Sequence, residues 1–170
     1  MLNINLRDSL WPVPEGIPLL REVRKIVIHH SATPITRHVT AGSIRRNHMA
    51  KGWKDIGYHW IIDRNGIVWE GRPEGLRGAH CKGWNDESIG VCWIGGLRGD
   101  GTPECNITAA QRTAMTALLQ LLHRRYPEAE LCGHRDLAPT LCPMLDAKAE
   151  WGYIFKHEII NLQNQNEQEN

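Results

Sequence analysis

Short apolar runs rich in β-branched residues are the feature that most limits how this 170-residue chain can fold. Two of them, KIVIHH at 25–30 and SIGVCWIGG at 88–96, are typical of buried strands. Residues 57–71 contain two more runs, on either side of the sequence DRNG at 63–66. Asn-Gly readily adopts the positive φ angles of a tight turn, so this segment predicts a β-hairpin. The chain therefore has to build a β-sheet.

The remaining regular elements are expected to be helices and one short strand. Three segments begin with a side chain that can cap a first helical turn. They are Thr40 before a helix over 41–51 that stops at Gly52, Thr108 with Gln111 in a capping-box pattern before a helix that Pro127 closes, and Asp146 before a last helix that reaches Ile159. A strand is expected at 129–132. The order β-α-β-β-β-α-β-α predicts the α/β class: a single domain with a central mixed β-sheet flanked by helices.

Length, charge and hydropathy exclude several classes of protein. A chain of this length can bury a core without disulfide support, and we expect the domain to cover residues 1–160, followed by a disordered polar tail at 161–170. The net charge of +1, with acidic and basic residues interleaved, argues against the basic face of a nucleic-acid-binding protein. No apolar stretch reaches the roughly 20 residues that span a bilayer, and the first residues lack the pattern of a secretory signal. We therefore expect a protein that is synthesised in the cytoplasm, binds no nucleic acid and does not insert stably into a membrane. We also expect it to be a monomer and, if its target is the cell wall, to reach it after release or export by another system.

Histidine and cysteine residues collect where predicted strands end. The first strand ends in His29 and His30, and since successive side chains of a strand point to opposite faces, only one of the two can face a given pocket. His134 follows another strand, and Cys142 lies on the same proline-rich segment. Two histidines and one cysteine would suit a catalytic zinc site, which uses three protein ligands and leaves the fourth position open. By spacing alone, however, a partly buried histidine and an inert thiol explain the pattern better.

Four segments follow one another in the order and spacing of a known enzyme family. They are IVIHHSAT, DIGYHWIIDRNGIVWEGRP, GAHCKGWNDESIGVCWIGG and GHRDLAPTLCPMLD. Over about residues 24–155 the chain resembles the type-2 N-acetylmuramoyl-L-alanine amidases, which include short phage lysozyme-amidases and animal peptidoglycan-recognition proteins. The resemblance implies a zinc ion at the floor of a groove that binds peptidoglycan. It also implies hydrolysis of the amide bond between N-acetylmuramic acid and L-alanine.

The resemblance assigns roles to individual residues. It implies that His29, His134 and Cys142 bind the zinc ion and that Tyr58 is catalytic, supporting the oxyanion or orienting the water. Thr140 lies where some phage enzymes have lysine and recognition-protein amidases have threonine, so we expect it to support the same oxygen as a neutral donor. Candidate contacts to glycan or stem peptide are His80, Trp84 and Asn85, although a loop that only caps the fold explains them nearly as well.

The cysteines distinguish branches of the family. Relatives that recycle muropeptides in the bacterial cytoplasm have an aspartate and a glutamate where this chain has Cys142 and Cys92, so the chain resembles the lytic, phage-like branch. Recognition proteins that bind without cutting typically lack the cysteine ligand, which favours an enzyme over a non-catalytic peptidoglycan-binding module. A structural zinc site would need a fourth protein ligand, and none has suitable spacing. Phage endolysin and injected bacterial effector both stay open. We expect Cys92 to fill the core, and His30 and His59 to be structural or to support the site.

Overall fold

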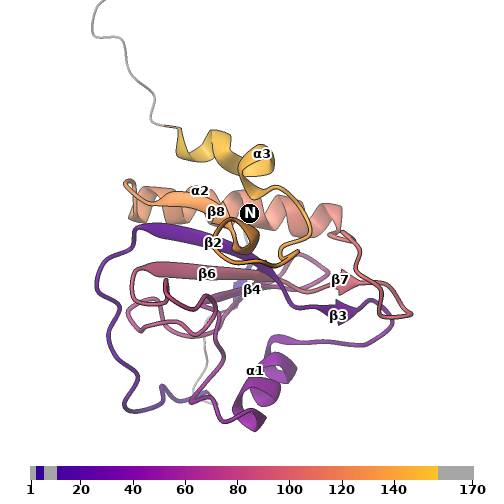
Figure 1. Cartoon of the computed structure of the whole chain (residues 1–170), viewed down its shortest axis with the longest axis horizontal. Coiled ribbons are helices and arrows are strands. Elements are labelled where there is room, and N and C mark those ends of the chain that lie inside the picture. Colours follow the sequence, from indigo (N-terminus) through magenta and orange to yellow (C-terminus); the bar gives the residue numbers. More distant parts are fainter. Residues whose placement is uncertain (1–2, 6–10, 157–170) are drawn as a thin grey trace, which may run out of the picture.

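The computed structural model describes residues 3–5 and 11–156. Its centre is a six-stranded sheet in the order β1-β5-β4-β6-β2-β8 (Figure 1). The strands are β1 (Ile4–Asn5), β2 (Lys25–His30), β4 (Trp60–Ile62), β5 (Val68–Glu70), β6 (Ser88–Trp93) and β8 (Glu130–Gly133). Neighbouring strands pair in parallel except β4 and β5, which form the predicted hairpin. The expected mixed sheet is confirmed.

The predicted strand over 88–96 is too long. β6 ends at Trp93, and the chain then turns through Gly95 and Gly96, whose φ angles are +144° and +98°. β7 (Gly96–Leu97) leaves the main sheet and pairs in parallel with β3 (Thr33–Pro34) as a separate two-stranded sheet. β3 follows β2 and β7 follows β6, so this small sheet lies next to the C-terminal ends of those two strands.

The helices begin at the predicted caps. Thr40 and Thr108 each make a complete capping box, and the Asp146 side chain accepts a hydrogen bond from the N–H of Ala149. The helices are α1 (Ala41–Ala50), α2 (Ala109–Arg125) and α3 (Ala147–Trp151), with 3₁₀ turns at His134–Asp136 and Gly152–Phe155. The α-helical part of the last segment is thus shorter than expected. Its predicted end at Ile159 and the tail at 161–170 lie outside the described residues.

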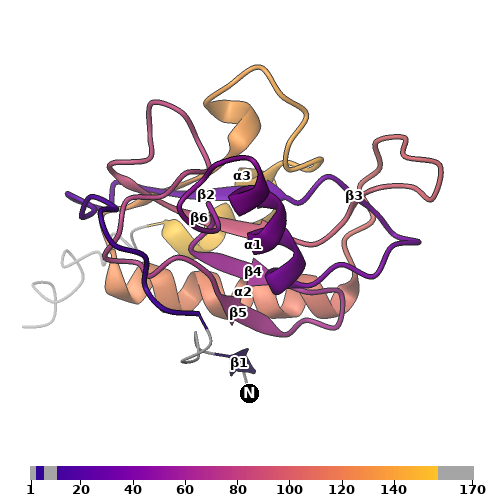
Figure 2. The ribbon, with the colours of Figure 1, turned by 90° about the horizontal axis from the view of Figure 1, so that it is seen from below.

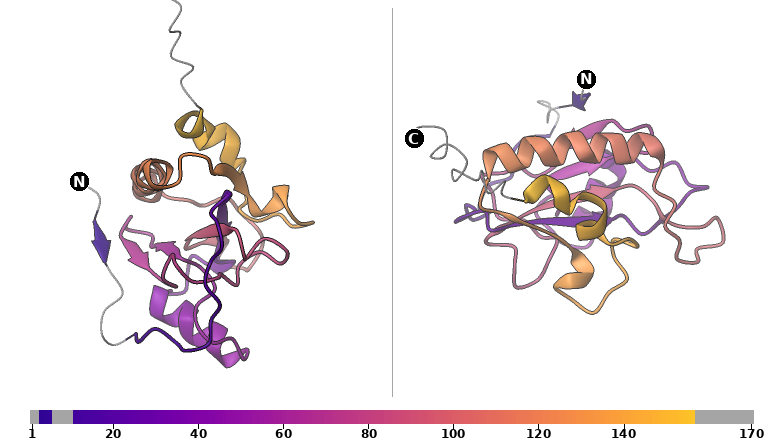
Figure 3. Two further views of the ribbon diagram at one scale, coloured as in Figure 1. Left: turned by 90° about the vertical axis from the view of Figure 1, so that its left-hand side faces the viewer. Right: turned by 90° about the horizontal axis from the view of Figure 1, so that it is seen from above.

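Helices cover both faces of the sheet. α2 and α3 lie on one face and α1 on the other, as Figure 2 and the left panel of Figure 3 show. The larger core joins α2, for example Met115 and Leu118, to Ile26 and Ile28 of β2. A smaller core joins α1 to Ile61 of β4 and its surroundings. Because alternate residues of β2 pack against α2, the residues between them point to the face of α1. Among the described residues no helix is long and apolar enough to cross a bilayer.

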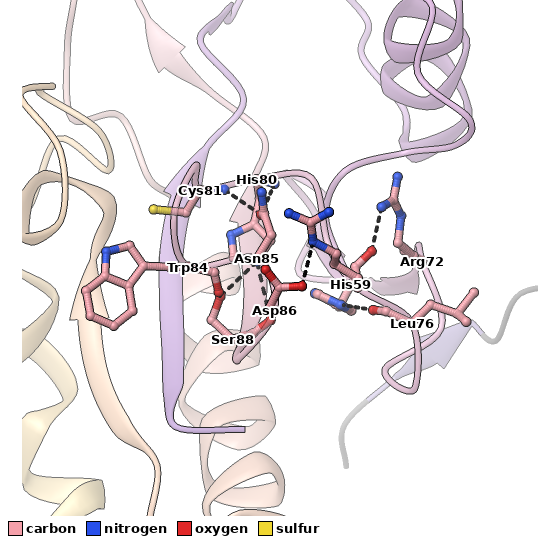
Figure 4. A network of polar contacts seen from close by, with 10 residues as sticks. His59, Arg72, Leu76, His80, Cys81, Trp84, Asn85, Asp86 and Ser88 are labelled. Carbon is pink, nitrogen blue, oxygen red and sulfur yellow. Dashed lines mark hydrogen bonds and ion pairs between the residues drawn. The ribbon is translucent and has the colours of Figure 1, made fainter. Parts of the chain in front are cut away.

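His59 is a completely buried histidine directly before β4. Its Nδ1 accepts a hydrogen bond of 2.9 Å from the N–H of Gly90. Its Nε2 lies 2.9 Å from the carbonyl oxygen of Leu76 (Figure 4). Burial lowers the pKa of His59 to about 4, so the ring is neutral at pH 7. A neutral ring satisfies both contacts by accepting at Nδ1 and donating at Nε2.

Replacing His59 with asparagine should flatten the acid dependence of stability. The unfolded chain binds a proton at His59 near pH 6.5, whereas the folded chain binds it only near pH 4, so the free energy of unfolding falls as the pH drops through this interval. This residue contributes a decrease of about 3 kcal/mol. The asparagine amide can still accept from Gly90 but does not titrate. Urea unfolding at pH 7 and pH 4 should show a smaller decrease for His59→Asn; an equal decrease would contradict the assignment. His38→Asn, at an exposed position, is the matched control.

Candidate metal centre

The pairing of β2 with β8 brings two histidines together. Ile28 is the register partner of Gly133; His29 is the next residue of β2, and His134 directly follows the end of β8. Their ring centroids lie 4.6 Å apart. His29 is buried, whereas His134 is only partly covered. The sheet therefore presents two adjacent imidazoles, one of them reachable from outside.

The loop after β8 brings Cys142 to the same place. The N–H of Arg135 donates a 2.7 Å hydrogen bond to the carbonyl oxygen of Cys142, which closes the loop at its two ends. The sulfur of Cys142 lies 3.7 Å from Nδ1 of His29 and accepts a hydrogen bond from the N–H of His30 at 3.3 Å. The possible ligand atoms of His29, His134 and Cys142 lie within 4.8 Å of one another, and the described part of the chain contains this one such cluster. The cluster could hold a metal ion.

A cavity of about 470 Å³ opens over this cluster. Tyr58, His80 and Thr140 line it together with the three candidate ligands. Apolar lining comes from Leu97, Pro103, Leu141 and Met144. The Leu141 side chain is 66% exposed. An exposed apolar side chain at the edge of a polar cavity is typical of a binding groove rather than of a core.

Tyr58 faces the cluster from the segment before β4. Its ring centroid lies 5.3 Å from that of His29. Burial, followed by the nearby Cys92 and Cys142, raises the pKa of Tyr58 well above its usual range, so its hydroxyl keeps its proton and can donate a hydrogen bond. Cys92 is fully buried, as expected, and is the register partner of His29 on β6. The thiol thus lies between the sheet and the tyrosine hydroxyl.

The charge state of the buried His29 suits metal binding. Burial, followed by the neighbouring His80 and His134, lowers the pKa of His29 well below its usual range. Neutral imidazole is the form that binds metals. Burial raises the pKa of Cys142 to about 11, an effect that the hydrogen bond from His30 opposes. That hydrogen bond is aimed at the sulfur, where a thiolate would place its charge.

Of the two consecutive histidines, the structure places His29 in the cluster. The ring of His30 lies 5.7 Å from that of Trp93, and its Nδ1 accepts a hydrogen bond from the N–H of Ala32 at 2.8 Å. Thr140 is exposed at the cavity wall, and its hydroxyl oxygen accepts from the N–H of Cys142 at 3.2 Å. Its own hydroxyl proton therefore stays available for a ligand in the cavity.

The three loop residues that were expected to contact substrate have different surroundings in the structure. His80 lines the cavity, with its Nδ1 2.9 Å from Nε2 of His29. Asn85 accepts hydrogen bonds from the N–H groups of His80 and Cys81 (Figure 4), and Trp84 lies under the ammonium of Lys25. Sequence reasoning missed the His29–His80 contact, because the two residues are 51 positions apart. Contact of His80, Trp84 and Asn85 with substrate stays a prediction.

Comparison with known proteins identifies the family. A sequence profile described as N-acetylmuramoyl-L-alanine amidase matches residues 19–145. The chain belongs to this family. It is 44% identical to an endolysin of Klebsiella phage KP32 over 140 residues, 82% of this chain and 91% of the relative. It is 43% identical to the endolysin of Escherichia phage T7 over 135 residues, 79% and 87% of the two chains. Over 158 residues it is 35% identical to a peptidoglycan-recognition protein of Drosophila simulans, covering 85% of each chain.

Solved structures give the same assignment. The amidase LysC from Clostridium intestinale superimposes with a TM-score of 0.75 at 27% identity, covering 88% of this chain and 97% of that one. A mutant of Drosophila PGRP-LB in complex with tracheal cytotoxin gives a TM-score of 0.73 at 26% identity, with 91% and 96% covered. The fold and enzyme class expected from the sequence are confirmed. The amidase is a hydrolase that cleaves the amide bond between N-acetylmuramic acid and L-alanine in peptidoglycan.

Substitution of Gly57 should disturb the amidase at Tyr58. A Cβ atom at Gly57 would lie 2.3 Å from the carbonyl oxygen of Ala79, so the two segments pack too closely for any side chain. Gly57→Ala should therefore lower the free energy of unfolding by about 1–3 kcal/mol, as overpacking does, and reduce activity by moving Tyr58. Gly75→Ala, where a Cβ meets nothing within 4 Å, is the matched control. Urea unfolding of both variants tests this, and equal stability would refute it.

Proposed function

We propose that His29, His134 and Cys142 hold a zinc ion in the amidase. Two imidazoles and one thiolate form a donor set that suits zinc, and three protein ligands leave a position for water or substrate. The observation that carries this proposal is the convergence of the three ligand atoms within 4.8 Å under an open cavity. When bound, zinc supplies Lewis-acid activation of the scissile carbonyl and of a water molecule.

The protein groups around the cluster have separate tasks. Tyr58 keeps its proton, so its hydroxyl can donate to the oxygen of the scissile carbonyl as negative charge develops there. Thr140 can donate to the same oxygen, because its own oxygen already accepts from the N–H of Cys142. The described residues that line the cavity include no carboxylate. The proton of the attacking water therefore passes to a group other than an aspartate or glutamate of this wall.

We place the enzyme on the bacterial cell wall as an endolysin-like lytic amidase. Phage endolysins are among its relatives at more than 40% identity. The ligand set and Tyr58 all come from one chain, so a monomer is sufficient for the site. The recognition-protein relatives supply the alternative, a module that binds peptidoglycan without cutting it. The complete ligand set together with Tyr58 favours cleavage.

Mass spectrometry of digested peptidoglycan tests the proposed reaction directly. Purified cell walls treated with the enzyme should yield glycan strands without peptide and stem peptides with a free L-alanine amino terminus. A strong chelator should stop this release, and added zinc should restore it. Cleavage within the glycan strand or within the stem peptide would refute the assignment, and binding without products would support the recognition module instead.

Neighbouring histidines should respond differently to the same substitution. His29→Ala removes a proposed ligand and should abolish both stoichiometric zinc binding and turnover. His30→Ala removes a ring that contacts Trp93 and Ala32, so about one zinc per chain should remain, with some loss of stability. Metal analysis of the two purified variants makes the comparison. Equal loss of zinc in both would overturn the choice of His29, and an active wild type without zinc would overturn the metal site.

Tyr58→Phe should separate chemistry from folding. The ring is retained, so zinc content and stability should hardly change, whereas kcat should fall with KM similar if the hydroxyl acts in the transition state. Loss of one such donor typically costs on the order of 10²- to 10³-fold, or roughly 3–4 kcal/mol. Thr140→Ala should have a smaller effect, and Thr140→Lys should preserve or raise the rate. Release of L-alanine amino termini at matched zinc loading is the measurement. A Tyr58→Phe enzyme at wild-type rate would remove the tyrosine from the mechanism.

A further inference from the structure

One ring nitrogen of His29 faces the candidate metal site, and the other ring nitrogen of His29 faces His80. Its Nδ1 lies 3.7 Å from the sulfur of Cys142, and its Nε2 lies 2.9 Å from Nδ1 of His80. A neutral imidazole carries one proton, and only the nitrogen without it can bind a metal. The position of that proton on His29 therefore decides whether its Nδ1 can be a ligand.

Ser88 and Trp84 define the direction of the hydrogen bonds behind His80. The hydroxyl oxygen of Ser88 lies 2.6 Å from the carbonyl oxygen of Trp84, and since a carbonyl only accepts, the serine proton must lie between these two oxygens (Figure 4). The same hydroxyl oxygen lies 3.3 Å from Nε2 of His80, and the carbonyl oxygen of Ser88 lies 3.5 Å from it. Both of these oxygens face Nε2 as acceptors, so Nε2 carries the proton of the neutral ring.

The proton position on His80 determines the proton position on His29. With its proton on Nε2, His80 has only a lone pair at Nδ1 and must accept from Nε2–H of His29. His29 is then left with a bare Nδ1 on the side of Cys142.

The His80 ring also packs closely against two glycines. A Cβ atom at Gly78 or at Gly90 would lie 2.5 Å from atoms of this ring, and neither glycine has a positive φ angle that would itself require glycine. The backbone N–H of His80 is held at 2.8 Å by Asn85. The absence of two side chains thus creates a niche that holds the imidazole against His29.

We propose that His80, oriented by Ser88 and the carbonyl of Trp84, is a positioning residue that fixes the His29 tautomer with a bare Nδ1 and so strengthens zinc binding. The inference rests on the proposed ligand set. It assigns the loop between β5 and β6 a role in metal affinity. Groups behind metal-binding histidines commonly change metal affinity by about 10- to 100-fold when they are removed.

Two substitutions of His80 separate this role from packing. His80→Phe keeps a ring in the niche but cannot accept from His29, so the zinc dissociation constant should rise by about 10- to 100-fold. His80→Asn leaves an amide oxygen near the former Nδ1, so its zinc affinity should stay closer to that of the wild type. A packing role predicts the opposite order, because phenylalanine fills the niche better than asparagine. Competition with a chromophoric zinc chelator measures all three proteins, and an order of Asn weaker than Phe would overturn the proposal.

The tautomer itself can be observed in the metal-free wild type by ¹⁵N NMR of the histidine rings. A proton on Nε2 of His29 is the expected result, and a proton on Nδ1 would overturn the proposal even if His80→Phe fails to fold. Ser88→Ala should weaken zinc binding less than His80→Phe, since the Ser88 carbonyl remains as an acceptor. His123→Phe, on α2 beside Phe155, is the control and should bind zinc as the wild type does.

The same measurements distinguish this inference from the proposed function. A wild type that binds zinc without cleaving peptidoglycan would refute the reaction and leave the tautomer assignment standing. A wild type that binds no zinc would refute the ligand set, and the NMR result would then decide the His29–His80 hydrogen bond alone.

Discussion

The parallel pairing of β2 with β8 is the contact on which the candidate metal centre of this amidase depends. Its register places His29 beside His134, and a slip of one residue would turn His29 to the opposite face. The register is held by packing far from the chemistry, because Ile26 and Ile28 are buried under α2. The hydrophobic core on one face of the sheet therefore sets the direction of a polar side chain on the other.

Buried neutral imidazoles make directed hydrogen bonds in the interior of the protein. His29, His59 and His80 are almost completely covered, and burial is the largest cause of the lowered pKa of each. Neutral rings can be buried because each offers one donor and one acceptor, and the neighbouring backbone and rings supply the partners. The protein thus uses histidine here as a directional hydrogen-bonding unit rather than as a charge.

Sequence reasoning succeeded where the signal is local. Thr40 and Thr108 cap helices through residues three positions away, and the Asn-Gly turn joins strands next to each other in the chain. β1, β3 and β7 have two residues each and exist only by pairing with distant strands, so no local pattern indicates them. Spacing alone could not select His29, His134 and Cys142 either. The family resemblance supplied that set, whereas the His29–His80 contact required the folded loop between β5 and β6.

The loop that carries Cys142 has a consequence for the chain as a whole. Cys142 and His29 are 113 residues apart in sequence, and the cysteines of the described structure form no disulfides. An ion held by these two residues and His134 would cross-link the first third of the chain to its last part, closing a loop of that length. Closing so long a loop restricts the unfolded ensemble, much as a disulfide does in an oxidised protein. In this amidase such an ion would then also tie the edge strand β8 and the segment that follows it to β2, and removing the ion would release that constraint.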